Sequence, residues 1–170
     1  MSAANMTGAS IAKGTVKPEW IDVNGHMNVA WYVLIFDLAI DELWAEFGIT
    51  DEYIKATNGS TFAVECHITY QSELLEHDPY IVTSQILAFD EKRIHHFQRL
   101  YHADTQVLAA TAEWMNLHID LGSRKVSVWP EFILANLEKI ASRQSELTMP
   151  DEVGKTMSIR KPHYSMVEQR

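Results

Sequence analysis

The chain has 170 residues, of which 46% are hydrophobic, and its formal net charge is −9. This length and apolar content predict one globular domain with a buried core, and the acidic balance argues against nucleic-acid binding, because such binding requires a basic face. A single cysteine, Cys66, and the lack of any apolar run as long as the roughly 18 to 20 residues of a membrane span indicate a cytoplasmic protein without a disulfide or a membrane segment.

Composition divides the chain into three parts. Residues 1–14 are small and polar and predict a flexible leader, without the apolar stretch of a signal peptide. Residues 15–147 hold the apolar patterns of a folded domain. Residues 148–170 are polar again, so we expect a loose C-terminal tail, or one that is draped over a partner.

A short polar stretch, Asp22-Val-Asn-Gly-His-Met-Asn28, precedes the most apolar part of the sequence. We interpret Lys17–Ile21 as the end of a first strand that leads into it. Asn24-Gly25 is a strong turn signal. Asn28 is a good N-cap, because its side-chain oxygen can accept from a free N–H in the first helical turn. The stretch therefore predicts a turn that is followed at once by a helix.

Residues 29–47 predict this helix, which ends at Gly48. Its first eight residues, Val29–Phe36, are all apolar or aromatic, and a helix without a polar face is buried all round. Acidic residues return only from Asp37 onward. At about 28 Å the helix is too long to be covered by one other helix, so it requires a broad apolar wall.

The rest of the domain reads mainly as strands. Residues 61–71 alternate and indicate a half-buried strand, and further strands are predicted at 80–89, 93–102 and 107–119, with short turns that make neighbours antiparallel. Residues 108–115 could also be helical, but they follow the preceding strand after only a short connection, which favours a hairpin. An amphipathic helix is predicted at 131–142. The apolar face of the first of these strands would consist of Phe62, Val64, Cys66, Ile68 and Tyr70.

Together these elements predict an α+β domain in which one antiparallel β-sheet curls around a long central helix, with a C-terminal helix outside. This order, with the motif Asp22-x-x-Gly-His-x-Asn28, resembles the hotdog-fold acyl-CoA thioesterases, specifically the 4-hydroxybenzoyl-CoA thioesterase-like branch. The resemblance covers residues 15–140 and includes Glu65-Cys-His-Ile-Thr-Tyr70. The Asn-Gly-His-Met stretch also resembles the betainyl-CoA thioesterase group, but residues 28–31 depart from its pattern, so that substrate is not inferred.

The resemblance implies that Asp22 is the catalytic carboxylate and that the substrate lies at the interface of a homodimer, alone or within a dimer of dimers. It implies no metal, and we expect no cofactor. Thioester hydrolysis needs an activated water or a carboxylate nucleophile, together with donors for the oxyanion. Asp22 fits either role. From the residues alone, Asp22 reads equally well as a turn former that caps Asn24 or Gly25.

The other motif residues also have two interpretations each. In one interpretation, His26 assists catalysis by orienting Asp22 or the substrate carbonyl. In the other, it is a partly buried histidine whose hydrogen bonds are made within the fold. The N–H groups of Gly25, of His26 or of the first helical turn could form the oxyanion site. Asn28 could position a water in addition to capping the helix.

Three aromatic residues beside the motif, Trp20, Trp31 and Tyr32, could line an acyl pocket or a cage for a quaternary ammonium group, although core packing is the simpler interpretation. Glu65 could meet the substrate or a partner subunit, or be solvated. The pair His95-His96 does not indicate a metal site, because adjacent residues on a strand point to opposite faces.

The sequence thus predicts an acyl-CoA thioesterase that releases a carboxylic acid and free coenzyme A. The same fold could instead carry a non-catalytic acyl-CoA binding module or an enoyl-CoA hydratase, because a fold alone does not fix a function. The motif spacing favours the thioesterase.

Overall fold

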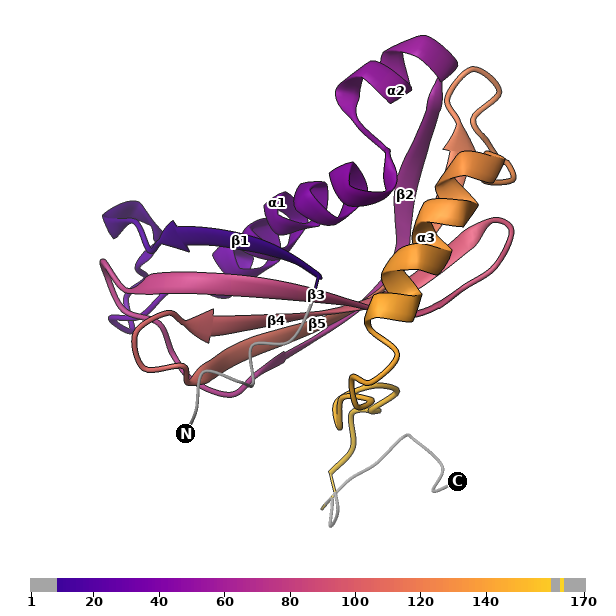
Figure 1. Cartoon of the computed structure of the whole chain (residues 1–170). Helices are drawn as coiled ribbons and strands as arrows, with labels where there is room; N and C mark the ends of the chain where they lie inside the picture. The colour runs from indigo at the N-terminus through magenta and orange to yellow at the C-terminus, as the bar shows by residue number, and fades with distance from the viewer. Residues whose placement is uncertain (1–8, 160–162, 164–170) are drawn as a thin grey trace.

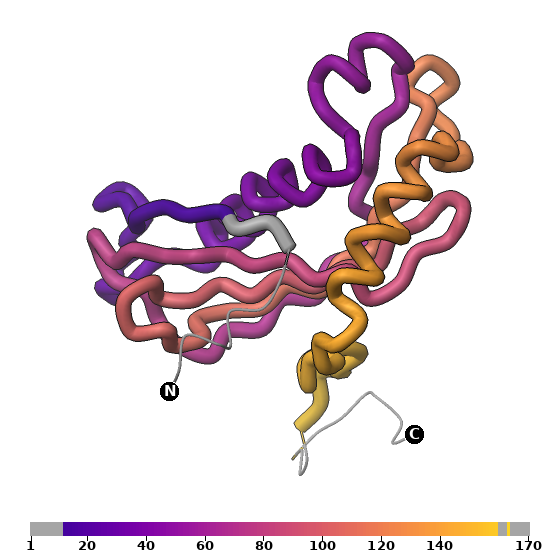
Figure 2. The backbone as a smooth tube through the Cα atoms, in the orientation of Figure 1, coloured from indigo at the N-terminus to yellow at the C-terminus, as the bar shows by residue number. Residues whose placement is uncertain are grey.

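The computed structural model describes residues 9–159 and residue 163, and its main feature is a curled sheet with a long helix against one face, as Figure 1 and Figure 2 show. In the sheet the strand order is β1-β3-β4-β5-β2, all neighbours are antiparallel, and β6 pairs with β5. The elements in chain order are β1 (Ala9–Thr15), the 3-10 turn η2 (Pro18–Trp20), α1 (Val29–Phe47), α2 (Asp51–Thr57), β2 (Gly59–Tyr70), β3 (Pro79–Phe89), β4 (Arg93–His102), β5 (Leu108–Asp120), β6 (Lys125–Val126) and α3 (Glu131–Arg143).

Helix α1 organises the core. Its first half packs through Phe36 against sheet residues such as Leu100, and its second half packs through Phe47 against Ile133 and Leu137 of α3. Each fully buried side chain of this size contributes about 1.5–3 kcal/mol. The predicted α+β class, with an antiparallel sheet curled around a long helix and a C-terminal helix, is therefore confirmed.

The bounds of the central helix are also confirmed. Asn28 caps its start, because its Oδ1 accepts from the Ala30 N–H at 3.0 Å, and Gly48 ends it in the left-handed region at φ 103°. The strands predicted at 80–89, 93–102 and 107–119 match β3, β4 and β5 within one residue, and the helix predicted at 131–142 matches α3.

The first strand was predicted in the wrong place. Residues 17–21 are not the end of a strand but contain η2, because Pro18 fixes φ and has no N–H for a ladder. The first strand is β1, which overlaps the segment 1–14 that we predicted to be a flexible leader; residues 1–8 of that segment lie outside the described residues. Gly14 allows this strand to lie close beneath the Tyr80 ring.

The short helix α2 was missed within a segment that carried no pattern. Thr50 caps it by accepting from the Tyr53 N–H at 3.2 Å, and Asn58 ends it in the left-handed region at φ 58°. None of its residues is buried. Only two adjacent residues, Tyr53 and Ile54, pack against the core, so the sequence offered no hydrophobic periodicity by which to find the helix.

Two predictions about burial are wrong for the single chain. Helix α1 is not buried all round, because Val29, Val33 and Leu38 are 55%, 40% and 57% exposed. Strand β2 does not keep one apolar face, because a bulge between Ala63 and Glu65 shifts its alternation. The sheet therefore covers α1 on one side only, and the edge strand β2 lies open next to it.

The start of the C-terminal tail rests on the sheet. The carbonyl of Thr148 accepts from Gln85 Nε2 at 3.3 Å, and the Gly154 N–H donates to Glu113 Oε2 at 2.8 Å. This part of the tail is draped over the chain's own sheet rather than loose. No helix among the described residues is long and apolar enough to cross a membrane.

Candidate active site

The loop before α1 is folded tightly on itself. Gly25 N–H donates to the Asp22 carbonyl at 3.0 Å, Asp22 N–H donates to the His26 carbonyl at 3.0 Å, and Gly25 has φ 82°, which favours glycine. The loop is tied to its surroundings by Met27 N–H, which donates to the Leu74 carbonyl at 2.8 Å. The structure thus brings Asp22, Gly25, His26 and Asn28 together, as the motif predicts.

The Asp22 carboxylate is held from two sides. Its Oδ1 accepts from the Asn24 N–H at 2.8 Å, and its Oδ2 accepts from Asn28 Nδ2 at 3.3 Å. An ionised carboxylate has about four acceptor sites, so both oxygens keep capacity for a water or a substrate. The turn-forming interpretation of Asp22 is confirmed, and the same two contacts fix the orientation of its carboxylate.

His26 lies next to this carboxylate. Its Nδ1 is 4.0 Å from Asp22 Oδ1 and 3.3 Å from the Met27 carbonyl oxygen, and its side chain is 33% exposed. A ring that donates from Nδ1 to a carbonyl carries its free lone pair on Nε2. In that tautomer His26 offers an acceptor nitrogen beside the motif.

The donors available for an oxyanion are fewer than the sequence suggested. Three of the N–H groups already donate hydrogen bonds within the loop and the first helical turn. Gly25 N–H donates to the Asp22 carbonyl, Ala30 N–H donates to Asn28 Oδ1, and Trp31 N–H donates to the Asn28 carbonyl. Within the described part of the chain, the N–H groups of His26 and Val29 have no hydrogen-bond partner. These two donors flank the positive end of α1, where an anion is favoured.

A cavity of about 270 Å³ opens beside these two donors. His26, Val29 and Tyr32 form one wall, and the segment from Tyr70 to Glu73, at the end of β2, forms the other. The segment after Tyr70 was not singled out from the sequence; its only signal is its place directly after a strand that resembles the family pattern.

Tyr32 is fixed in place within this wall. Its hydroxyl oxygen accepts from the Leu74 N–H at 3.1 Å, and its ring meets Tyr70 edge to face at 5.2 Å. Burial raises the pKa of Tyr32. The phenol therefore stays neutral and shapes the cavity rather than acting as a base.

The proposed aromatic cage beside the motif does not form. Trp20 and Trp31 stack with ring centroids 5.3 Å apart and an interplanar angle of 17°, which leaves no room for a cation between them, and the Lys17 ammonium lies 5.3 Å from the Trp20 ring. Trp31 does not line the cavity next to the motif. The contacts of this pair agree with the core-packing interpretation, since Trp20 belongs to the core and Trp31 packs against it.

Glu65 and the histidines lie elsewhere. Glu65 is exposed on β2 and does not line the motif cavity. His95 contacts Glu113 at 2.8 Å on one face of the sheet, while the buried His96 contacts Asn116 at 3.1 Å on the other, as expected for neighbours on a strand. Desolvation raises the pKa of the Cys66 thiol to about 11, so the nucleophilic thiolate is scarce at neutral pH.

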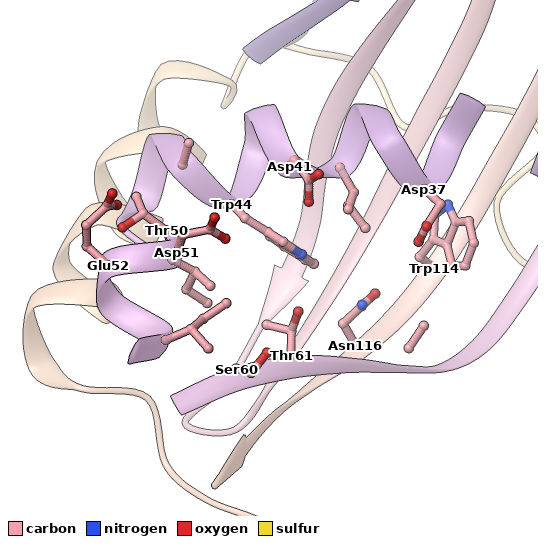
Figure 3. Close-up of a pocket in the computed structure, with 15 residues that line it drawn as sticks. Asp37, Asp41, Trp44, Thr50, Asp51, Glu52, Ser60, Thr61, Trp114 and Asn116 are labelled. Carbon is pink, nitrogen blue, oxygen red and sulfur yellow. The ribbon is translucent and has the colours of Figure 1, made fainter. Parts of the chain in front are cut away.

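A second and larger cavity, of about 600 Å³, lies further along α1 (Figure 3). Asp37, Asp41 and Trp44 reach it from α1, and Trp114 and Asn116 reach it from β5. None of these residues was predicted to belong to a site. The available signal was the spacing of four and three residues between Asp37, Asp41 and Trp44, which places them on one face of the helix.

The fold and the motif loop together define a hotdog-fold protein of the thioesterase class. Residues 16–137 match the thioesterase-like superfamily. A betainyl-CoA thioesterase of Pseudomonas aeruginosa is 33% identical over 144 residues, which are 85% of this chain and 91% of that protein. An L-carnitine dehydrogenase/betainyl-CoA thioesterase of Rhizobium meliloti is 36% identical over 82% of this chain, which spans only 28% of that longer protein.

Solved structures agree with this assignment. A Staphylococcus aureus protein in complex with CoA has a TM-score of 0.84 and 30% identity, with 93% of this chain and 99% of that one covered. A thioesterase structure from Pseudomonas putida has a TM-score of 0.80 and 32% identity, with 91% and 99% covered. The chain belongs to the thioesterase-like superfamily, and the predictions of the hotdog fold and of a thioester hydrolase are confirmed.

Proposed function

We propose that the protein is an acyl-CoA thioesterase in which Asp22 acts as general base or as nucleophile, with the oxyanion held at the N-terminus of α1. The observation that supports this most directly is the pair of free N–H donors, His26 and Val29, beside a carboxylate that Asn24 and Asn28 hold in place. Coenzyme A is supported as the carrier by the S. aureus neighbour that was solved in complex with it.

The reaction needs one water. Water adds to the thioester carbonyl carbon while its proton passes to Asp22, and the oxyanion accepts hydrogen bonds from the two N–H donors. The C–S bond then breaks, and the proton passes to the leaving thiolate of coenzyme A. If Asp22 attacks instead, the thiolate leaves first, and water then hydrolyses the anhydride.

The active form is proposed to be a homodimer, alone or within a dimer of dimers. Helix α1 exposes Val33 and Leu38, and β2 exposes Val64 and Tyr70 at the edge of the sheet. A long exposed edge strand beside an apolar helix face is covered in natural proteins. A second copy would extend the sheet through β2 and bury both surfaces, and Glu65 on this strand would then meet the partner or the substrate. The cytoplasm is the compartment we expect for it, since Cys66 is a free thiol.

Thiol release from a panel of acyl-CoAs tests the proposal. The panel contains short, branched, aromatic and long acyl groups, and also betainyl-CoA, the substrate named for the P. aeruginosa relative. We expect turnover of at least one member. Tight binding of acyl-CoA without any thiol release would point to a binding module, and hydration of crotonyl-CoA without thiol release would point to a hydratase.

A further inference from the structure

The hydroxyl of Tyr32 makes one hydrogen bond, in which its oxygen is the acceptor. The Leu74 N–H donates to this oxygen at 3.1 Å, so the hydroxyl hydrogen has to point elsewhere. Among the residues that the structure describes, no acceptor lies in hydrogen-bond geometry with that hydrogen. Tyr32 is only 4% exposed, and a buried tyrosine hydroxyl usually finds an acceptor. The Tyr32 O–H is therefore a donor that a bound molecule can use.

This hydroxyl lies where the two walls of the motif cavity meet. Leu74 joins the walls, because its N–H donates to Tyr32 on α1 and its carbonyl accepts from the Met27 N–H in the motif loop at 2.8 Å. Tyr32 and Glu73, the residue before Leu74, both line the cavity. Glu73 is exposed, and its charge acts on the Tyr32 phenol. The ring of Tyr32 thus packs in the core while its hydroxyl end is next to the cavity.

Tyr32 shares its wall with the two free N–H donors. It follows Val29 by three residues, so both lie on the same face of α1. An aromatic side chain on a helix covers the turn N-terminal to its own Cα, and here that turn begins with the Val29 N–H. His26, Val29 and Tyr32 all line the same cavity. Three unused donors, two N–H groups and one O–H group, therefore border one cavity.

The phenol keeps its proton at neutral pH. Burial raises the pKa of Tyr32 above its ordinary value of 10.0, and the nearby charge of Glu73 raises it further. A hydrogen bond to an ionised acceptor is roughly twice as strong as one between neutral groups. A neutral O–H therefore stabilises an oxyanion more than it stabilises the carbonyl oxygen of the bound substrate, and this difference accelerates the reaction.

We propose that the Tyr32 hydroxyl is a catalytic donor. Together with the N–H groups of His26 and Val29, it donates to the oxyanion that forms when water or Asp22 adds to the thioester carbonyl. Tyr32 neither gains nor loses a proton, and the Leu74 N–H holds its oxygen in place. This role rests on the proposed thioesterase function and adds a residue to the same site.

Tyr32→Phe removes the donor and keeps the ring. With the acyl-CoA that the wild type hydrolyses fastest, we expect kcat to fall about 100-fold while KM changes less than about threefold. Tyr80→Phe removes the hydroxyl of a β3 tyrosine that does not line the cavity, and it should keep the wild-type kcat. With an active wild type, an unchanged kcat in Tyr32→Phe, or a rise in KM alone, would overturn the role of Tyr32 and leave the thioesterase function standing. A wild type that releases no thiol would refute both.

A second variant separates donation from the contact with Leu74, because Tyr32→Phe also leaves the Leu74 N–H without its acceptor. 3,5-Difluorotyrosine at position 32 keeps the ring and the oxygen but has a more acidic phenol. Once ionised, this phenol still accepts from the Leu74 N–H but can no longer donate. We expect the ratio of kcat between the fluorinated and the native protein to fall at least about tenfold as pH rises through the pKa of the fluorinated phenol.

The ratio removes the effect of the other titratable groups, since both proteins contain them. Those that face the Tyr32 hydroxyl are Tyr70, Glu73 and Asp78, and His26 lies in the same cavity wall. Ultraviolet absorbance of the phenolate reports the ionisation of the fluorinated residue. A constant ratio while the phenolate forms would mean that the hydroxyl only accepts from Leu74, and the proposal would then be wrong.

Discussion

The Asn28 side chain links the Asp22 carboxylate to the start of α1, since its Nδ2 donates to Asp22 Oδ2 at 3.3 Å and its Oδ1 accepts from the Ala30 N–H at 3.0 Å. One residue thus caps the helix and holds the carboxylate that we propose to be catalytic. These two functions can be separated by substitution.

Asn28→Ser should keep the cap and lose the contact with Asp22, because a serine hydroxyl can accept from the first turn but is too short to reach the carboxylate. We expect the free energy of unfolding to change by a few tenths of a kcal/mol while kcat falls. Asn28→Ala should lose about 1 kcal/mol of stability as well. Denaturation curves and steady-state kinetics measure the two effects, and an unchanged kcat in Asn28→Ser would rule out a positioning role.

Asp22→Asn should lower kcat/KM by at least about 100-fold, because the amide is neither a base nor a nucleophile. Stability should be retained, since the amide oxygen can still accept from the Asn24 N–H. Thiol release under steady-state conditions gives the rates, and Asp151→Asn, on the exposed tail, is the control. Full activity in Asp22→Asn would exclude Asp22 as the catalytic carboxylate.

The sequence predicted those parts of the fold that follow from local patterns. The cap at Asn28, the stop at Gly48 and the hairpins of β3, β4 and β5 each depend on neighbouring residues. Helix α2, strand β1 and the bulge in β2 depend on tertiary contacts or on short segments without periodicity, so no local pattern indicated them.

The residues of the candidate site also divide into those that a local sequence pattern predicted and those that only the folded chain brings together. Asp22, Gly25, His26 and Asn28 lie together because one loop carries them all. Trp20 and Trp31 lie near each other in the sequence, which suggested an aromatic cage. In the structure their rings stack on each other instead. The larger cavity is lined by residues of both α1 and β5. Asp37 and Trp114 are more than 70 positions apart in the sequence, so only the folded chain brings them to the same cavity.

Stability should fall in mild acid because of His96. Burial lowers the pKa of His96 from 6.5 to about 4, so between these values the unfolded chain binds a proton that the folded chain does not. The free energy of unfolding therefore decreases as pH falls through this window, by up to about 3 kcal/mol at 1.36 kcal/mol per pKa unit.

Urea denaturation at several pH values between about 4.5 and 7.5 measures this dependence. His96→Phe should be less stable at neutral pH, because Asn116 loses its partner, but its stability should change less with pH. His77→Gln, on the exposed surface, should keep the wild-type slope. An identical slope in His96→Phe would assign the acid sensitivity to other groups.

The proposed homodimer should dissociate when charge is placed on the edge strand. Val64 is 56% exposed on β2, and a lysine there would be buried against the second copy at a large desolvation cost. Val64→Lys should be a folded monomer in light scattering after size exclusion. Val107→Lys, 48% exposed in the turn between β4 and β5, should stay dimeric. A monomeric wild type would refute the proposed assembly.

Gln144 hydrogen-bonds the backbone of β3 next to Ser84, where the described pairing of β3 with β1 ends, and its removal should be costly. Its Oε1 accepts from the Ile86 N–H at 2.8 Å and its Nε2 donates to the Ser84 carbonyl at 3.4 Å, and the side chain is 8% exposed. Gln144→Met conserves the shape but leaves both backbone groups buried without partners, at about 1–3 kcal/mol each. We therefore expect urea denaturation to show a loss of about 2–4 kcal/mol. Ser145→Ala, the exposed next residue, should change stability by less than about 0.5 kcal/mol. A loss in Gln144→Met as small as that of the control would mean that water satisfies this edge equally well.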